Sequence, residues 1–418
     1  MGMGTKKSRR RWIIAGVTAV SAALALAAFG SSAQSAGAPS VDVWAIVPGA
    51  DAPQIPAGVQ AAFRYVDSHG GVGKQHQQVV VKLCDSQDTA PGEIQCGQQA
   101  ASDAKSIAVV APVIISADAT FTSELSKVHE PIINDNPSSP ADYVNPINFP
   151  LWSSNFAYAA CAVMTAKAVH ATKVAFAALS VPASINSLNV AIAGAKRAGL
   201  TVVGHIEAAP STTDLAPFVR QLQQDKPQVT VLVMDPPLDS QWLSASAQLG
   251  ASGPMCTNEG LVANQSLAGD GAHASQFYTA GYYPDPSASG YPELTQFRSQ
   301  AAAEVKAGNS NAALTLGNNP QFVEYGWLSA QPVVQAAANV NGVITRTTFL
   351  AALNRTTVTF GTGSAALLPP LDFAKPNSDP KYTRLFNTKL NLQKWDVATK
   401  VFEPVPGVAP VYGDKLLP

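Results

Sequence analysis

The fold is decided by the stretch VQAAFRYVDSHGGVGKQHQQVVVKLCDSQD at residues 59–88, where a helical pattern changes into a strand. Residues Val59 to Val66 predict a helix, and the apolar run Val79 to Leu83, after a Gly-Gly turn, predicts a strand. This strand stops at a polar loop, residues 84–88. Because open α/β sheets bind ligands beside the carboxyl ends of parallel strands, we expect a binding cleft at such loops.

The composition predicts a globular protein with two lobes. The chain has 418 residues, of which 46% are apolar and 13% charged, and its formal net charge is -1. One hydrophobic core rarely serves a chain of this length, so two lobes of ordinary domain size are expected. Five basic residues precede residue 39, which leaves 22 basic against 28 acidic residues in the remainder and disfavours a nucleic-acid partner.

The N-terminus has the order of an export signal, which we predict for residues 1–38. Cations between Lys6 and Arg11 precede the apolar run Trp12 to Phe29, and small residues follow at Ser31 to Ala38. Residues 8–13 partly fit the twin-arginine pattern, so this route and ordinary secretion both stay open. A retained membrane anchor is the alternative, since the run is long enough to span a bilayer. We expect an exported, extracytoplasmic protein.

Export bears on the cysteines, because an oxidising compartment permits disulfides. The four cysteines, Cys84, Cys96, Cys161 and Cys256, allow three connectivities. We favour Cys84 with Cys96, because the first lies at a predicted strand end and the second on the helix expected to follow. This leaves Cys161 with Cys256. A metal site is disfavoured, because the chain has no Cys-x-x-Cys pair and its six histidines lack ligand spacing.

From Val41 onward, short apolar runs alternate with helical patterns, which is typical of parallel sheets built from βαβ units. The first series predicts strands Val41–Val47, Val79–Leu83, Ile107–Ala111 and Pro131–Ile133, and helices Ala57–Val66, Ile94–Ala104 and Ala119–Val128. The second predicts strands Lys173–Ala178, Thr201–Ile206, Val229–Met234 and Pro254–Thr257, and helices Asn155–Val169, Ile185–Ala198, Asp214–Gln224 and Asp239–Leu249. The last third predicts strand Phe277–Tyr283, helices Tyr291–Lys306, Gln321–Asn339 and Thr347–Leu353, and a hairpin within Arg384–Pro404.

The opening order of strand, helix, Gly-Gly turn, strand and acidic loop resembles type I periplasmic binding proteins, specifically the branched-chain amino acid receptor group of ABC importers. The tail, Leu367–Phe373 followed by Arg384–Asn387, is similar to that of actinobacterial members. The resemblance implies an α/β fold of two Rossmann-like lobes with parallel sheets, joined by a hinge of three crossings. The implied crossings are Ile147–Ser153, Tyr282–Pro286 and Gly363–Phe373, and the implied lobes are residues 39–152 with 284–365 and residues 153–283 with 366–418.

The resemblance also implies ligand-binding residues. Ser116 takes the place of a serine that, with backbone amides after the third strand, holds a ligand carboxylate, although Ser116 serves equally as part of a helix cap. Pro137 and Ser138 match a loop whose carbonyl and hydroxyl meet the ligand, although a Pro-rich turn looks the same. Glu259 matches the acidic residue that faces the ligand ammonium, and is otherwise a solvated loop acid.

Gln54 and Tyr282 complete the candidate set. Gln54 is placed at the rim of the cleft, and Tyr282, with Tyr283 and Trp152, lies near the crossings, where aromatic rings either line the cleft or pack the hinge. Residues 179–184 lack the aromatic that the family carries there, and residues 48–54 lack its Ser-Gly pair. The ligand class, whether amino acid, amide, urea-like molecule or apolar acid, therefore stays open.

No catalytic signature accompanies this pattern. The chain lacks the Gly-x-Ser-x-Gly elbow and the phosphate-binding P-loop, and its Ser-x-x-Lys at residues 102–105 lies inside a predicted helix without companion motifs. We therefore expect a substrate-binding protein of an ABC importer rather than an enzyme. It would take a small solute, such as a branched-chain amino acid or a related amide or carboxylate, to a membrane permease, with no cofactor. A ligand sensor of the same fold and a secreted hydrolase without recognisable motif are the alternatives.

Overall fold

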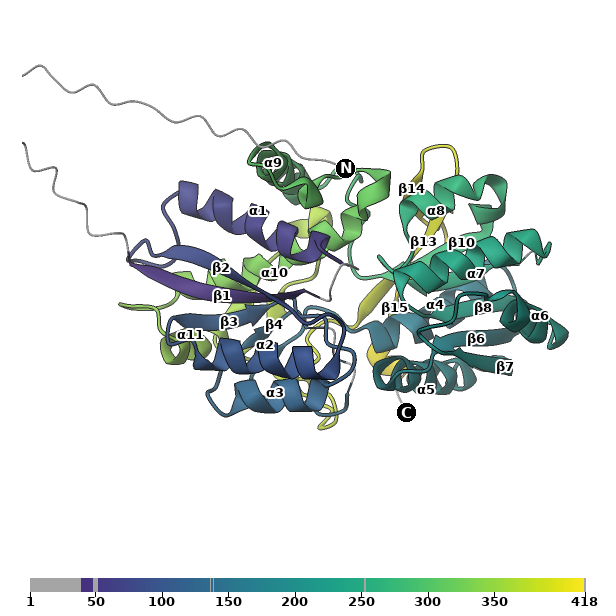
Figure 1. The fold of residues 1–418 in the computed structure, drawn as a ribbon, viewed down its shortest axis with the longest axis horizontal. Helices are drawn as coiled ribbons and strands as arrows, with labels where there is room; N and C mark the ends of the chain where they lie inside the picture. The colour runs from purple at the N-terminus through teal and green to yellow at the C-terminus, as the bar shows by residue number, and fades with distance from the viewer. Residues whose placement is uncertain (1–38, 48–51, 136, 138, 252, 417–418) are drawn as a thin grey trace, which may run out of the picture. The chain divides into compact units, whose positions relative to one another are not determined.

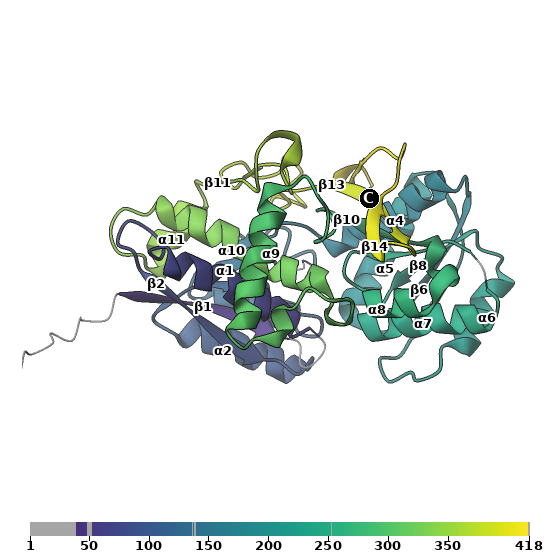
Figure 2. The same cartoon turned by 90° about the horizontal axis from the view of Figure 1, so that it is seen from above.

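The frame of the protein is a pair of α/β sheets, each covered by helices on both faces (Figures 1 and 2). The computed structural model describes residues 39–47, 52–135, 137, 139–251 and 253–416. The predicted export signal, residues 1–38, lies outside the described residues. In the described part of the chain, no helix has both the length and the apolar composition needed to cross a membrane.

The first sheet is parallel throughout, with strand order β2-β1-β3-β4-β5. Its strands are β1 (Ser40–Val47), β2 (Gln78–Asp85), β3 (Ser106–Val110), β4 (Ile132–Ile133) and β5 (Asn148–Phe149). One face carries α1 (Gln54–Ser68) and α10 (Pro320–Ala338), and the other carries α2 (Ala90–Ser102) and α3 (Asp118–Ser126). Helix α9 (Pro292–Lys306) lies against α1, and α11 (Arg346–Leu353) lies against α10 and β3. Strand β3 is therefore buried along its whole length, as apolar runs in parallel sheets are.

The second sheet is mixed, with strand order β14-β13-β10-β9-β8-β6-β7 and β15 paired to β13. Its parallel strands are β6 (Lys173–Leu179), β7 (Thr201–Ala208), β8 (Val229–Val233), β9 (Met255–Asn258) and β10 (Phe277–Gly281), and its antiparallel strands are β13 (Lys389–Asp396), β14 (Val401–Pro404) and β15 (Val411–Tyr412). Alternate residues of β6 enter two different cores, one under α4 (Ser154–Ala168) and α5 (Pro182–Arg197), the other under α6 (Ala216–Gln224) and α7 (Pro236–Gln248).

Two glycines let α1 and α10 pack backbone against backbone. A Cβ atom on Gly58 would collide with the carbonyl oxygen of Val323, and one on Gly326 with the carbonyl oxygen of Ile55. The two helices can approach this closely only because neither glycine has a side chain. Their amino-terminal turns are thereby held together at the edge of the sheet where β1 ends.

The predicted elements are present, with ends that differ by a few residues, and two findings differ from expectation. Strand β5 was not predicted, because it is two residues long and lies in a Pro-rich stretch. The third passage between the sheets comes later than residues 363–373: β12 (Leu371–Asp372) pairs with β11 (Thr357–Val358), and the ring of Phe373 lies 5.1 Å from that of Phe149 in β5. Arg384 also bonds to the first sheet, its Nε donating to the Asn148 carbonyl at 2.7 Å. The exact lobe boundaries stay a prediction.

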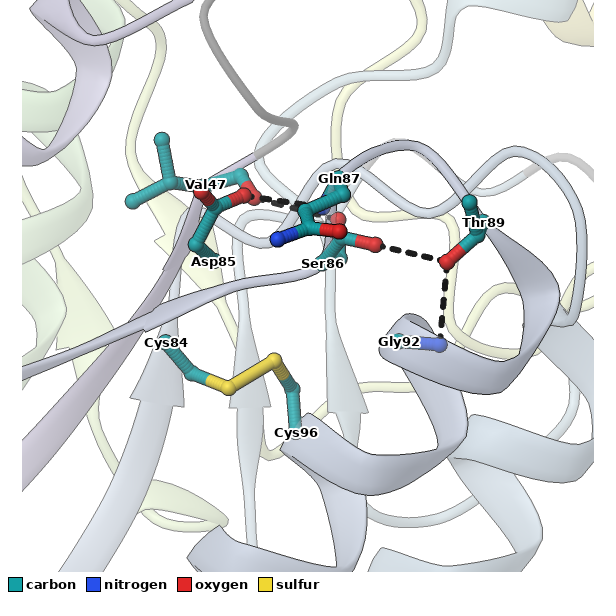
Figure 3. Close-up of a disulfide and its surroundings, with 8 residues drawn as sticks. All are labelled: Val47, Cys84, Asp85, Ser86, Gln87, Thr89, Gly92 and Cys96. Atoms are coloured by element: carbon teal, nitrogen blue, oxygen red, sulfur yellow. Dashed lines mark hydrogen bonds between the residues drawn. A yellow bond between two sulfur atoms is a disulfide. The ribbon is translucent and has the colours of Figure 1, made fainter.

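Both favoured disulfides are present. Cys84 at the end of β2 bonds to Cys96 on α2, with Cα atoms 5.6 Å apart, and Cys161 on α4 bonds to Cys256 on β9, with Cα atoms 5.8 Å apart. Figure 3 shows the first of these beside the β2–α2 loop, where the Thr89 hydroxyl accepts a hydrogen bond from the Gly92 N–H at 3.2 Å. The disulfide and this helix cap fix the same loop to the end of β2.

The two disulfides are expected to contribute unequally to stability. Their cysteines are separated by 12 and 95 residues, so the loop-closure entropy removed from the unfolded chain is about 3 kcal/mol for Cys84–Cys96 and about 5 kcal/mol for Cys161–Cys256. Urea unfolding of the Cys84→Ala/Cys96→Ala and Cys161→Ala/Cys256→Ala double variants tests the order. A larger loss from the first pair would contradict it.

Candidate functional site

A cavity lies where the carboxyl ends of the parallel strands of both sheets meet. It encloses about 1120 Å³ of empty space, part of it open to solvent. Most of its lining comes from loops that follow strands, joined by the first turns of α1 and α10. These residues are Ala52, Ile55, Asp88, Val113 to Ile115, Leu179 to Ser184 in part, Met234 to Pro236, Asn258 to Leu261, Tyr283, Gln321, Phe322 and Tyr325, with Trp152, Tyr158 and Ser187. The expected cleft beside strand ends is therefore present.

The walls of the cavity are mainly apolar and aromatic. The Trp152 ring meets the Tyr325 ring edge to face, with centroids 5.4 Å apart. The Tyr325 hydroxyl donates to the backbone carbonyl of Asn134, which fixes the ring at the end of β4. At the end of β6 and in the loop after it, where the family's aromatic is absent, the aliphatic side chains of Leu179 and Val181 take part in the lining. Such walls suit a ligand with an apolar body.

Glu259 is a buried carboxyl in the cavity wall. Its side chain is 5% exposed; Oε2 accepts from the Tyr282 N–H at 3.2 Å, and Oε1 has no hydrogen-bond partner among the described residues. A Cβ atom on Gly281 would overlap this carboxyl, so the bare backbone of β10 makes room for it. Burial, and secondly the charge of Asp285, raise the pKa of Glu259 well above its ordinary value.

Two more buried acids lie near Glu259. Both carboxyl oxygens of Glu324 on α10 are without a hydrogen-bond partner in the described structure, and burial, followed by the charges of Glu259 and Asp285, raises its pKa well above the ordinary value. Asp285 accepts hydrogen bonds from Gln321 Nε2 at 3.3 Å and from the Phe402 N–H at 3.2 Å. The ion pairs found in the described residues all lie elsewhere, and the one cation that acts on this group of acids is Arg298, whose charge lowers the pKa of Glu324.

The backbone amides after β3 already have an acceptor. Glu93 on α2 is fully buried, and its carboxyl accepts from three successive N–H groups: Ile115 at 2.9 Å, Ser116 at 3.1 Å and Ala117 at 2.5 Å. Burial raises the pKa of Glu93, and these N–H groups counter that rise. The sequence predicts that these amides hold a ligand carboxylate. In the structure the Glu93 carboxyl accepts from them instead, at the amino terminus of α3.

Of the five predicted ligand residues that the structure describes, Glu259 is the one that lines the cavity. Ser116 lies in an adjoining hollow, which shares Ile115 and Ala183 with the cavity and is also lined by Ser139. Pro137 is buried, its carbonyl accepting from the Tyr143 hydroxyl at 2.9 Å, and Ser138 lies outside the described residues. Gln54 begins α1, and its side chain donates to Asn318 at 3.3 Å. The Tyr282 hydroxyl donates to the Ser153 carbonyl at 2.7 Å. Neither residue contributes to the lining.

Several lining residues were not proposed from sequence. Gln321, Phe322 and Tyr325 come from the first turns of α10, far along the chain from the strand-end loops. Asn258, directly before Glu259, is 1% exposed, and both its side-chain amide atoms lack partners among the described residues. No sequence signal distinguished Glu93 from an ordinary acid in the first turn of a helix. In the described residues, no group of three His, Cys, Asp or Glu side chains has the geometry of a metal site.

Comparisons with known proteins agree on the type of fold. A model of a family described as periplasmic binding protein matches residues 47–382. Three solved structures are each 16% identical to the chain. A leucine binding protein from Thermotoga maritima has a TM-score of 0.70, covering 90% of this chain and 99% of that one. A fatty acid ABC transporter substrate-binding protein from Thermomonospora curvata has 0.67, covering 90% and 92%. A solute binding protein from R. palustris in complex with 4-hydroxybenzoate has 0.70, covering 89% and 97%. No curated protein matches the chain.

Replacement of Glu93 is expected to destabilise the protein. Glu93→Ala leaves three partly buried N–H groups without their acceptor, and we expect a loss of about 3 kcal/mol in the free energy of unfolding. Urea unfolding measures the loss. Glu403→Ala, at an exposed position on β14, is the matched control, and equal stability of the two variants would contradict the role given to Glu93.

Replacement of Glu259 is expected to stabilise the ligand-free protein in a pH-dependent way. The folded state binds the Glu259 proton more tightly than the unfolded state, so the contribution of this carboxyl to stability is greatest at low pH and falls as pH rises above its ordinary pKa of 4.5. Glu259→Gln removes that loss. The variant should therefore unfold at a higher temperature than the wild type at pH 8, with the difference vanishing near pH 4.5. A constant difference at all pH values, or none, contradicts the assignment; exposed Glu207→Gln is the control.

Proposed function

Since the chain belongs to the periplasmic binding protein family, we propose that it is the extracytoplasmic substrate-binding protein of an ABC importer. In this role it holds a small solute in the cavity at the strand ends and presents the loaded form to a membrane permease. The family consists of solute receptors rather than enzymes, so the hydrolase alternative is set aside. The proposed export signal, residues 1–38, would bring the protein to that location.

The cavity is the observation that carries this proposal. Its lining combines loops from both sheets, mainly apolar walls, and a few buried polar atoms without partners, which is the composition of a small-molecule site. The solved neighbours are described as binding leucine, fatty acids or 4-hydroxybenzoate. All of these have an apolar body, which is the part of a ligand that the walls of this cavity fit.

The two-lobe organisation supplies the mechanism. The chain passes between the sheets at residues 150–153, again after β10, and a third time before β13, and such short connections act as hinges. We propose that two lobes close over the solute: residues 39–152 with 284–386, and residues 153–283 with 387–418. The third boundary is placed after residue 386 because residues 371–386 are bonded to the first lobe. A solute favours closure only through contacts that the open form lacks.

Ligand binding is expected to raise the unfolding temperature. The protein is freed of bound ligand by unfolding and refolding with its disulfides intact, and is then screened against amino acids, amides, amines and carboxylic acids. At a ligand concentration a hundred times Kd, binding adds about 2.7 kcal/mol to stability. Ala183→Trp, which fills the cavity at the start of α5, should abolish the rise, whereas Asn189→Trp on the exposed face of the same helix should not.

Uptake separates import from sensing. Deletion of the gene should abolish cellular uptake of the solute found in the screen, and the wild-type gene should restore it while the Ala183→Trp gene should not. Unchanged uptake in the deletion strain would contradict the importer role and favour the sensor. No binding by any solute class would contradict the receptor function altogether.

A further inference from the structure

The charged side chains that line the cavity are acidic. Asp88, Asp235 and Glu259 line it, and among the lining residues that the structure describes there is no Lys, Arg or His. Asp285 and Glu324 add two more carboxyl groups behind the wall formed by Glu259 and Tyr283, and Arg298 is the cation that acts on Glu324. An anionic ligand would enter this field against repulsion, and a cationic ligand would be attracted.

The backbone amides after β3, which could otherwise bind a ligand carboxylate, are already hydrogen-bonded. The N–H groups of Ile115, Ser116 and Ala117 are the donors after β3 from which an anion could accept, and all three donate to Glu93. A ligand carboxylate would have to displace a fully buried carboxyl from its three donors. The side of the cavity formed by Val113 to Ile115 is left to apolar contact.

The lining holds buried polar atoms without hydrogen-bond partners in the described structure: three acceptors, and the donors Trp152 Nε1 and Asn258 Nδ2. Glu259 Oε1, Asn258 Oδ1 and Gln321 Oε1 all belong to lining side chains that are at least nine-tenths buried, and none has a hydrogen-bond partner in the described structure. Gln321 donates its Nε2 to Asp285, which fixes its oxygen as the atom left over. Buried acceptors without partners are costly in the empty protein, and a donor from the ligand would satisfy them.

On the premise of the receptor function above, we propose that the solute is a hydrophobic amine: an apolar body with a positively charged primary ammonium group and no carboxylate. The ammonium group carries three N–H donors, matching the three unpartnered acceptors of Glu259, Asn258 and Gln321. Trp152, Tyr283 and Tyr325 present aromatic rings in the same wall, and such rings attract a cation. The apolar body packs against Ile55, Val113 to Ile115 and Leu261.

Two sets of matched probes test the proposal by titration calorimetry. The first is 3-methylbutylamine, leucine and 4-methylpentanoate, which share the 3-methylbutyl group and carry on it the amine, both groups or the carboxylate. The second is 2-phenylethylamine, phenylalanine and 3-phenylpropanoate. In at least one set the amine should bind at least tenfold more tightly than the amino acid, with the carboxylate weakest. Preference for the amino acid or the carboxylate in both sets overturns the proposal, as does failure of both amines to bind.

Two variants test whether the preference for the amine depends on Glu259 and Gln321. Glu259→Gln, expected to fold stably, should weaken the amine at least tenfold and leave the matched alcohol, 3-methylbutan-1-ol or 2-phenylethanol, unchanged; Gln321→Leu should weaken the amine less, since it removes a neutral acceptor. Amine binding unaffected by Glu259→Gln overturns the proposal. Binding of a carboxylate or another solute that Ala183→Trp abolishes would leave the receptor function standing while this proposal fails, so the two failures are distinct.

Discussion

The arrangement of the binding cavity depends on one constraint, that the strands of a parallel sheet all end at the same edge. In both sheets the loops after β1, β3, β6, β8 and β9 are thereby gathered at one place, although their residues span more than two hundred positions of the chain. Loops at such an edge expose backbone N–H groups at the start of the next helix. The chemistry of the cavity then depends on which acceptors those N–H groups bond to.

In this protein the N–H donors after β3 bond to Glu93, and this bonding decides whether that side of the cavity can bind an anion. A ligand-binding loop with free amides is an anion site, whereas the same loop with its amides bonded to a buried side chain is an apolar surface. Glu93 is supplied by α2, whose own position is fixed by the Thr89 cap and the Cys84–Cys96 disulfide. The specificity of the site is thus connected to a part of the fold that does not touch the ligand.

Sequence patterns predicted most of the fold, because each βαβ unit is a local signal: an apolar run, a turn and a helical period. They predicted the third crossing less well, since the pairing of β11 with β12 and the bonds of Arg384 to the first sheet join residues far apart in sequence. The site followed the same rule. Glu259 was identified from a local motif. Glu93, Gln321 and Tyr325 act through contacts between elements that are distant in sequence, and no sequence spacing predicts them.

The two sides of the cavity contribute differently to binding. The first sheet and α10 supply mainly apolar and aromatic lining, with Asp88 and Gln321 as polar members, whereas Asp235, Asn258 and Glu259 come from the second sheet. In a receptor that closes by hinge motion, the open form can hold a solute by its apolar body alone, but closure is stabilised only by what the second lobe adds. A solute without a matching polar group would therefore bind without favouring the closed form. Selectivity then lies in the closing step, where the buried acceptors of the second lobe either gain a partner or remain without one.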